Sequence, residues 1–202
     1  QKTSLAPNGV KDLKDPALVG EKHPPWPKHF SRYKRKAIFS GSDVEHNRKA
    51  VQLIVEQIAP RLNTECGFII QGACGRRFRS QAGENVYFDL AWDSFERYAC
   101  PGVVGLNPVT QGAGTNLKLS HYLAHGLPVL STRFGVRGYR ELEPLVNLCP
   151  IEGFAEALCR MDFKPRFVDD SLQPYLWSSI AGHLRDVYLD LLDRTDSNAS
   201  HC

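Results

Sequence analysis

Apolar positions along this chain follow two spacings, short continuous runs and runs that repeat every three or four residues. Each continuous run is bounded by glycine, proline or polar residues and predicts a buried strand. The runs lie at 36–41, 67–72, 85–90, 103–108, 128–132 and 145–150. Strands that are apolar on both faces are typical of a parallel sheet that is covered on both sides.

The runs with helical spacing lie between these strands. Residues 47–62 place apolar side chains on one side of a helix, and Asn47 is a candidate cap for its first turn. Further helices are expected at 93–99, within 112–132 and at 151–161. Strands that alternate with helices predict an α/β fold, a Rossmann-like parallel sheet with helices on both faces and right-handed crossovers.

The two ends of the chain differ from this central region. Residues 1–36 contain proline and glycine too often for a regular element and predict a linker arm, whereas 37–194 form one α/β domain. The domain ends with a long helix at 173–192 whose apolar stripe predicts packing, and 195–202 are expected to be a disordered tail. The stripe consists of Leu176, Ile180, Leu184, Val187 and Leu191.

Composition and charge restrict the class of protein. The chain has 202 residues, of which 42% are hydrophobic, and its longest apolar runs are far shorter than the roughly 20 residues of a membrane helix. A net charge of +3 is too small to indicate nucleic-acid binding, although the basic run at 32–36 could contact phosphate or an anionic membrane instead of simply being solvated. Six cysteines without a C-x-x-C pair favour a reduced, cytoplasmic compartment.

The stretch 112–132 carries the clearest chemical signal, because two glycines and a threonine precede its helix and a strand follows. In open α/β sheets, ligands bind at the loops after the strands. Gly112 and Gly114 let the backbone turn and approach a ligand, while Thr115 or Asn116 can cap the helix. The free N–H groups of the first helical turn would attract an anion, most simply a phosphate or diphosphate. An ordinary strand-to-helix turn is the alternative.

Helical geometry sorts the side chains that follow. One face is expected to look into a cleft, and Lys118 on it would add a full positive charge, while the opposite face packs on the sheet. The expected cleft face holds Lys118, His121, Tyr122 and His125, and the expected sheet face holds Leu117, Leu119, Leu123 and Ala124.

Three other motifs fit this stretch poorly. Leu117 stands where a G-x-G-x-x-G fingerprint needs its third glycine, and a Walker A loop needs glycine directly before lysine. His121 and His125 have the spacing of a zinc pair, but no glutamate follows His121 and no third ligand is evident. We therefore expect no metal site here.

The chain resembles the C-terminal half of a retaining GT-B glycosyltransferase, and is most similar to glycosyltransferase family 4. The resemblance is carried by "PNGV" at 7–10, "NVYF" at 85–88, "NPVTQGAGTNLKLSHYLAHGLPVLST" at 107–132, "GVRGY" at 135–139 and "WSSIAGHLRDVYLDLL" at 177–192. It implies that "PNGV" is the hinge after a missing N-terminal domain. It also implies metal-independent binding of a nucleotide-diphosphate sugar, without a cofactor, for transfer of a hexosyl group to a glycan or lipid-linked acceptor.

The resemblance also assigns roles to individual residues. Gly112, Gly114, Thr115 and Asn116 match the backbone donors to the diphosphate, and Lys118 matches a lysine of the G-x-G-T-x-L-K variant. Leu90 and Ala91 fall where the family contacts the base. Gly41 and Ser42 match the loop after the first strand, where many members place an arginine on the diphosphate. Ser42 replaces that arginine, so Arg48 or Lys49 would have to supply the charge.

Two positions depart from the family pattern. The paired glutamates that contact the donor sugar and the ribose would fall at Ala113 and His121, and neither residue is acidic. A histidine can still bond a ribose hydroxyl through a ring nitrogen. Two alternatives therefore stay open: a degenerate, non-catalytic GT-B-like binding or scaffold domain of a larger protein, and a phosphosugar epimerase of the same architecture.

Overall fold

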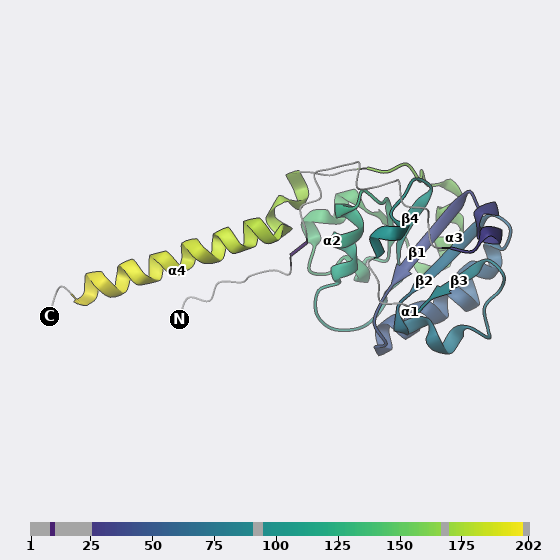
Figure 1. Cartoon of the computed structure of the whole chain (residues 1–202), viewed down its shortest axis with the longest axis horizontal. Helices are drawn as coiled ribbons and strands as arrows, with labels where there is room; N and C mark the ends of the chain where they lie inside the picture. Colours follow the sequence, from purple (N-terminus) through teal and green to yellow (C-terminus); the bar gives the residue numbers. More distant parts are fainter. Residues whose placement is uncertain (1–8, 11–25, 91–94, 167–169, 200–202) are drawn as a thin grey trace.

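Six strands of the chain form one parallel sheet. The structure is a computed structural model that describes residues 9–10, 26–90, 95–166 and 170–199 (Figure 1). Within these residues the strand order is β3-β2-β1-β4-β5-β6, and every neighbouring pair is parallel. The strands are β1 (Arg35–Ser40), β2 (Cys66–Gln71), β3 (Val86–Asp89), β4 (Val103–Asn107), β5 (Val129–Ser131) and β6 (Asn147–Leu148).

This order places the topological switch point between β1 and β4. The chain runs outward from β1 to β3 on one side, then returns to the middle and runs outward from β4 to β6 on the other. The loops after β1 and β4 therefore diverge at the carboxyl edge of the sheet, which is where open α/β folds commonly bind ligands. The predicted Rossmann-like α/β fold is confirmed.

Helices cover both faces of the sheet. The helices are α1 (Glu45–Leu53), α2 (Leu117–Ala124), α3 (Phe154–Arg160) and α4 (Trp177–Ala199). One buried apolar cluster joins α1 and α3 to residues such as Phe39 and Leu106, and a second joins α2 to residues such as Ile38 and Val129. Successive strand residues face opposite sides, so continuous apolar runs supply both clusters.

The first helix differs in detail from the prediction. α1 begins at Glu45 with Val44 at the N-cap position, so Asn47 is an interior residue and not the cap. The helical path continues through a π-helical turn at Ile54–Ile58 and a 3-10 turn at Ala59–Leu62. Pro60 lacks an N–H group, which accounts for a change of hydrogen-bond spacing at this point.

Short 3-10 turns connect the other elements. They span Lys28–Arg32, Ala73–Phe78, Phe95–Tyr98, Phe134–Val136, Arg140–Leu145, Ile151–Gly153 and Asp170–Tyr175. The helix expected at 93–99 is the Phe95–Tyr98 turn, and the one expected at 151–161 is a 3-10 turn followed by α3.

The described cysteines, which exclude Cys202, are free thiols, and burial raises the pKa of Cys66 and Cys74 to about 12.

Part of the expected linker belongs to the domain. Phe30 and Tyr33 are almost fully buried, and the Phe30 ring packs over Gly67 in β2. β1 itself begins at Arg35, so a boundary at residue 37 is too late. Residues 1–8 and 11–25 lie outside the described part, but Val10 bridges to Leu176 in a parallel arrangement.

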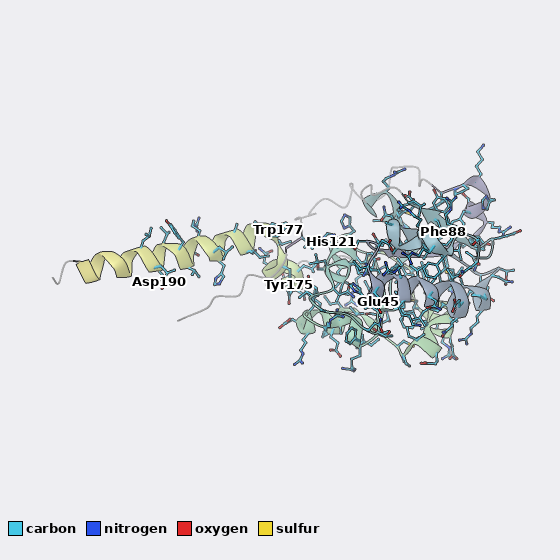
Figure 2. The ribbon with its side chains drawn as sticks, turned by 90° about the horizontal axis from the view of Figure 1, so that it is seen from below. Glu45, Phe88, His121, Tyr175, Trp177 and Asp190 are labelled. Atoms are coloured by element: carbon cyan, nitrogen blue, oxygen red, sulfur yellow. The ribbon has the colours of Figure 1, made fainter. Side chains whose placement is uncertain are left out.

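α4 extends away from the sheet instead of packing along it (Figures 1 and 2). Leu176 and Ile180, at its root, are buried, whereas Leu184 is 44% exposed and Leu191 is 56% exposed. The prediction of a packing helix is therefore wrong beyond the root. The helix also continues to Ala199, so residues 195–199 are helical and not part of a disordered tail. Among the described residues, no helix is both long enough and apolar enough to cross a membrane.

Candidate anion site at the switch point

The glycine loop follows the carboxyl end of β4, at the switch point. Gly112 has φ of 119° and Gly114 has φ of 74°, values in the left-handed region that glycine tolerates best. A Cβ atom at Gly112 would also lie 2.9 Å from the ring of His46 in α1. Both expectations of a glycine-dependent turn are confirmed, and the loop brings the starts of α1 and α2 together.

The first turn of α2 has no side-chain cap, although the Leu119 amide donates to the carbonyl oxygen of Asn116 at 3.0 Å. Asn116 occupies the N-cap position, but its side chain makes no capping hydrogen bond. Instead its Nδ2 donates to Oδ1 of the fully buried Asn107 at the end of β4, at 2.8 Å. The positive end of the helix dipole therefore faces the loop without a side-chain cap.

Lys118 is held by two asparagine side chains. Its Nζ donates to Oδ1 of Asn47 and to Oδ1 of Asn116, both at 3.1 Å, and lies 4.8 Å from the centre of the Phe39 ring. Asn47 in turn donates to the carbonyl oxygen of Ser42 at 3.1 Å. A continuous polar network thus connects the loop after β1 with the first turn of α2, across the switch point.

Three basic side chains gather around the glycine loop. Burial, together with the charge of Arg137, lowers the pKa of Lys118 to about 8. Burial also lowers the pKa of His46, with additional contributions from Lys118 and Arg137. Within the described residues, none of the three forms an ion pair with a carboxylate. An anion placed among them would relieve this mutual repulsion and raise both pKa values.

Arg137 is a site residue that the sequence did not single out. Its Nη2 donates to the carbonyl oxygen of Ala113 at 3.1 Å, and its guanidinium lies 4.1 Å from the centre of the Phe134 ring. Gly138 beside it packs against Thr115, since a Cβ there would lie 2.5 Å from Cγ2 of Thr115. In the sequence, the "GVRGY" segment shows no link to the glycine loop, because 24 residues separate Arg137 from Ala113.

The loop after β1 agrees with the prediction only in part. Gly41 is buried, and a Cβ at this position would lie 2.8 Å from the side chain of Asn47, whereas Ser42 is exposed. Arg48 pairs with Asp43 at 2.9 Å, so its charge is already neutralised. Lys49 is exposed and donates to Oε1 of Gln52 at 3.2 Å. Neither residue joins the network around Lys118, and the expectation that one of them supplies the missing charge is not supported.

The remaining predicted residues have mixed outcomes. Leu90 is half-buried just after β3, and Ala91 lies outside the described residues. His121 is exposed on α2 (Figure 2). Thr115 is also exposed, as is Ala113.

The expected division of α2 into two faces is wrong at three positions. Leu117 is 41% exposed, while Tyr122 and His125 are buried. The Tyr122 hydroxyl accepts a hydrogen bond from the Ser40 amide at 3.0 Å, because Gly105 leaves room for its ring on β4. Nδ1 of His125 lies 2.8 Å from the carbonyl oxygen of His121, and the His125 ring is buried whereas His121 is exposed. The described residues contain no group of three or more potential metal ligands.

The structure is an α/β domain with a glycine loop and a lysine at its switch point. A family model described as "Glycosyl transferases group 1" matches residues 34–161, well over half of the chain. The chain therefore belongs to the glycosyl transferases group 1 family. No curated protein matches it.

Three solved structures share the fold. OtsA in its apo form is 14% identical with a TM-score of 0.60, and the match covers 95% of this chain and 51% of that one. WaaG, described as a glycosyltransferase involved in lipopolysaccharide biosynthesis, is 18% identical with a TM-score of 0.51, covering 78% and 47%. TarM is 15% identical with a TM-score of 0.50, covering 83% and 34%.

At these identities the likeness concerns the fold, which is that of a GT-B glycosyltransferase domain. The chain spans between about a third and about half of the length of these structures.

Proposed function

We propose that this chain is the C-terminal, donor-binding domain of a retaining glycosyltransferase of family 4 type. It binds a nucleotide-diphosphate sugar, and the complete enzyme transfers the hexosyl group to a glycan or a lipid-linked acceptor. The observation that carries the proposal is the junction of the glycine loop, the α2 N-terminus without a side-chain cap and Lys118 at the switch point. The helix end and Lys118 are both positive and lie beside the loop, and within the described residues Lys118 forms no ion pair.

The proposed chemistry depends on the charge of the leaving group. As the bond between the sugar and the diphosphate breaks, negative charge grows on the diphosphate. Amide groups and a lysine that are already oriented stabilise that charge more in the transition state than in the ground state. The network from Asn107 through Asn116 to Lys118 holds these donors in place before the donor sugar binds. No metal or cofactor is required by this mechanism.

We further propose that α4 carries the contact with an N-terminal half of the enzyme. Leu184, Tyr188 and Leu191 form part of an exposed apolar surface on a helix that extends from the sheet. Apolar patches of this kind mark protein interaction surfaces. The acceptor and any base that activates it would be bound by that half, and the enzyme would act in the cytoplasm, in peripheral contact with a membrane where the acceptor is lipid-linked.

Calorimetric titration of the chain with UDP, GDP and ADP tests the proposal. We expect saturable binding of one nucleotide, with the same affinity in the presence of EDTA. Lys118→Ala and Gly114→Val should each weaken it about tenfold or more, because a charge-assisted hydrogen bond or the loop geometry is lost. Lys49→Ala is the matched control, since Lys49 lies outside the polar network, and it should leave the affinity unchanged.

The same titration distinguishes the alternative. Ala113 and His121 replace two acidic residues of the family pattern, which favours a degenerate binding or scaffold domain. Absence of binding for all three nucleotides at millimolar concentration would reject the donor-binding proposal and support that alternative.

A further inference from the structure

Arg137 stands on the opposite side of the glycine loop from Lys118. Lys118 is held from the β1 side, through Asn47 of α1 and the Phe39 ring. Arg137 follows the Phe134–Val136 turn after β5 and reaches the loop through the carbonyl oxygen of Ala113. Because β4 lies between β1 and β5 in the sheet, the two cations flank the loop from opposite directions.

The guanidinium of Arg137 is held before any ligand binds. It donates to the carbonyl oxygens of Ala113 and Phe134, at 3.1 Å and 3.3 Å, and stacks on the Phe134 ring. These contacts use part of the donor fork and leave the rest unused, and no carboxylate of the described residues pairs with it. A fixed guanidinium with free donors is suited to binding a carboxylate through two parallel hydrogen bonds.

The sheet order gives a direction to a bound donor. In the proposed function, the base lies near Leu90 at the end of β3, and the diphosphate lies at the switch point between β1 and β4. A donor that continues in the same direction along the order β3-β2-β1-β4-β5 would have its glycosyl group beyond β4, on the side of β5. Arg137 lies on that side of the loop. It donates to the carbonyl oxygen of Ala113, the residue between Gly112 and Gly114.

We propose that the glycosyl group of the donor carries a carboxylate, as in a hexuronic acid, and that Arg137 binds it. The inference rests on the proposed function and adds the substrate class. The diphosphate accounts for the charge of Lys118 and the helix end, whereas a neutral hexose would offer the remaining donors of Arg137 only hydroxyl groups. A carboxylate on the sugar would match the planar geometry of the guanidinium.

The experiment compares matched donors on the wild-type chain. For whichever of UDP, GDP or ADP binds, calorimetry measures the affinities of its glucosyl and glucuronosyl derivatives, and of its galactosyl and galacturonosyl derivatives. We expect the acidic sugar of at least one pair to bind about tenfold more tightly than its neutral partner, which is the effect of one added charge-assisted contact at a partly exposed site.

Two arginine variants identify the residue responsible. Arg137→Gln should weaken binding of the acidic donor more than binding of the neutral donor and so remove the preference for the acidic sugar; a loss common to both donors would reflect its contact with the glycine loop. Arg133→Gln is the matched control, because Arg133 belongs to the same segment but pairs with Glu143 at 2.7 Å. It should leave the ratio of affinities unchanged.

Each other result overturns the inference. If both acidic sugars bind no more tightly than their neutral partners, the inference fails and the proposed function stands. If Arg137→Gln weakens acidic and neutral donors equally, Arg137 positions the loop or binds the diphosphate. If no nucleotide binds, the proposed function and the inference fail together.

Discussion

Helices α2 and α4 meet the rest of the molecule in opposite ways. The eight residues of α2 bury Leu119, Tyr122 and Leu123 against the sheet, and its first turn faces the glycine loop. The 23 residues of α4 bury Ile180 at the root and leave Leu184 and Tyr188 exposed (Figure 1). Both helices carry apolar side chains at helical spacing. An apolar stripe therefore indicates that a helix packs against some surface, but the stripe does not identify that surface.

A glycine-to-alanine substitution in or beside each helix tests how tightly α2 and α4 are packed. Gly105→Ala places a Cβ 2.4 Å from the buried Tyr122 ring, so we expect it to displace α2 and lower the free energy of unfolding by about 3 kcal/mol. Gly182→Ala in α4 meets nothing within 4 Å and should leave the unfolding of the domain unchanged.

Urea denaturation measures the first effect, and circular dichroism measures the helix content of α4. Alanine favours a helix over glycine by up to about 1 kcal/mol, so Gly182→Ala should raise helicity slightly. Equal destabilisation by both variants would show that α4 is as tightly packed as α2.

The charge of Lys118, in the first turn of α2, is expected to have the next largest effect, on the affinity for the nucleotide diphosphate. With the pKa of Lys118 lowered to about 8, its amine is protonated at pH 7 and mostly neutral at pH 9. We expect the affinity for the nucleotide diphosphate to fall about tenfold between these pH values, because the bound anion favours the protonated amine. Lys118→Met should bind more weakly at pH 7 and lack this decrease.

The same lowered pKa has a consequence for stability of the unliganded chain. Between about pH 8 and the ordinary lysine pKa of roughly 10.4, the unfolded chain binds this proton more tightly than the folded one. The stability of the wild type relative to Lys118→Met should therefore rise with pH across that window. Chemical denaturation at several pH values checks the sign, and a fall across the window would contradict the assigned burial.

Glycine substitutions in the loop give a smaller change. Gly114 has positive φ but open space around it, so Gly114→Ala should cost about 1 kcal/mol of backbone strain alone. Gly112→Ala adds a clash with His46 and should cost more. Thermal unfolding of the two variants measures the difference, and an unchanged stability in both would mean that the turn relaxes.

The smallest effect is expected at the far end of α4. Leu184→Glu combined with Leu191→Glu should change the unfolding free energy of this chain by less than about 0.5 kcal/mol, because both side chains are exposed. Ile180→Glu is the matched control and should destabilise the chain strongly, since Ile180 is only 4% exposed. A large loss from the double variant would indicate that the outer part of α4 packs against this domain.

Most of the fold and part of the site followed from local patterns. Continuous apolar runs identified the six strands of the described sheet within a few residues, and the G-x-G-T segment identified the turn with two glycines at positive φ. The distant side chains of the site were not predictable in this way. His46 and Arg137 reach the loop from α1 and from the segment after β5, and no spacing in the sequence connects them with it.

The alternation of strands and helices and the position of the glycine loop could be read from the amino-acid sequence. Both depend on interactions between near neighbours: side-chain periodicity and the steric freedom of glycine. The tertiary structure decided the remainder. It neutralised Arg48 with Asp43, buried Tyr122, set Lys118 between Asn47 and Asn116, and left α4 without a partner surface along its outer length in the described chain. Those outcomes depend on contacts between surfaces that are distant in the sequence, and local sequence patterns do not predict such contacts.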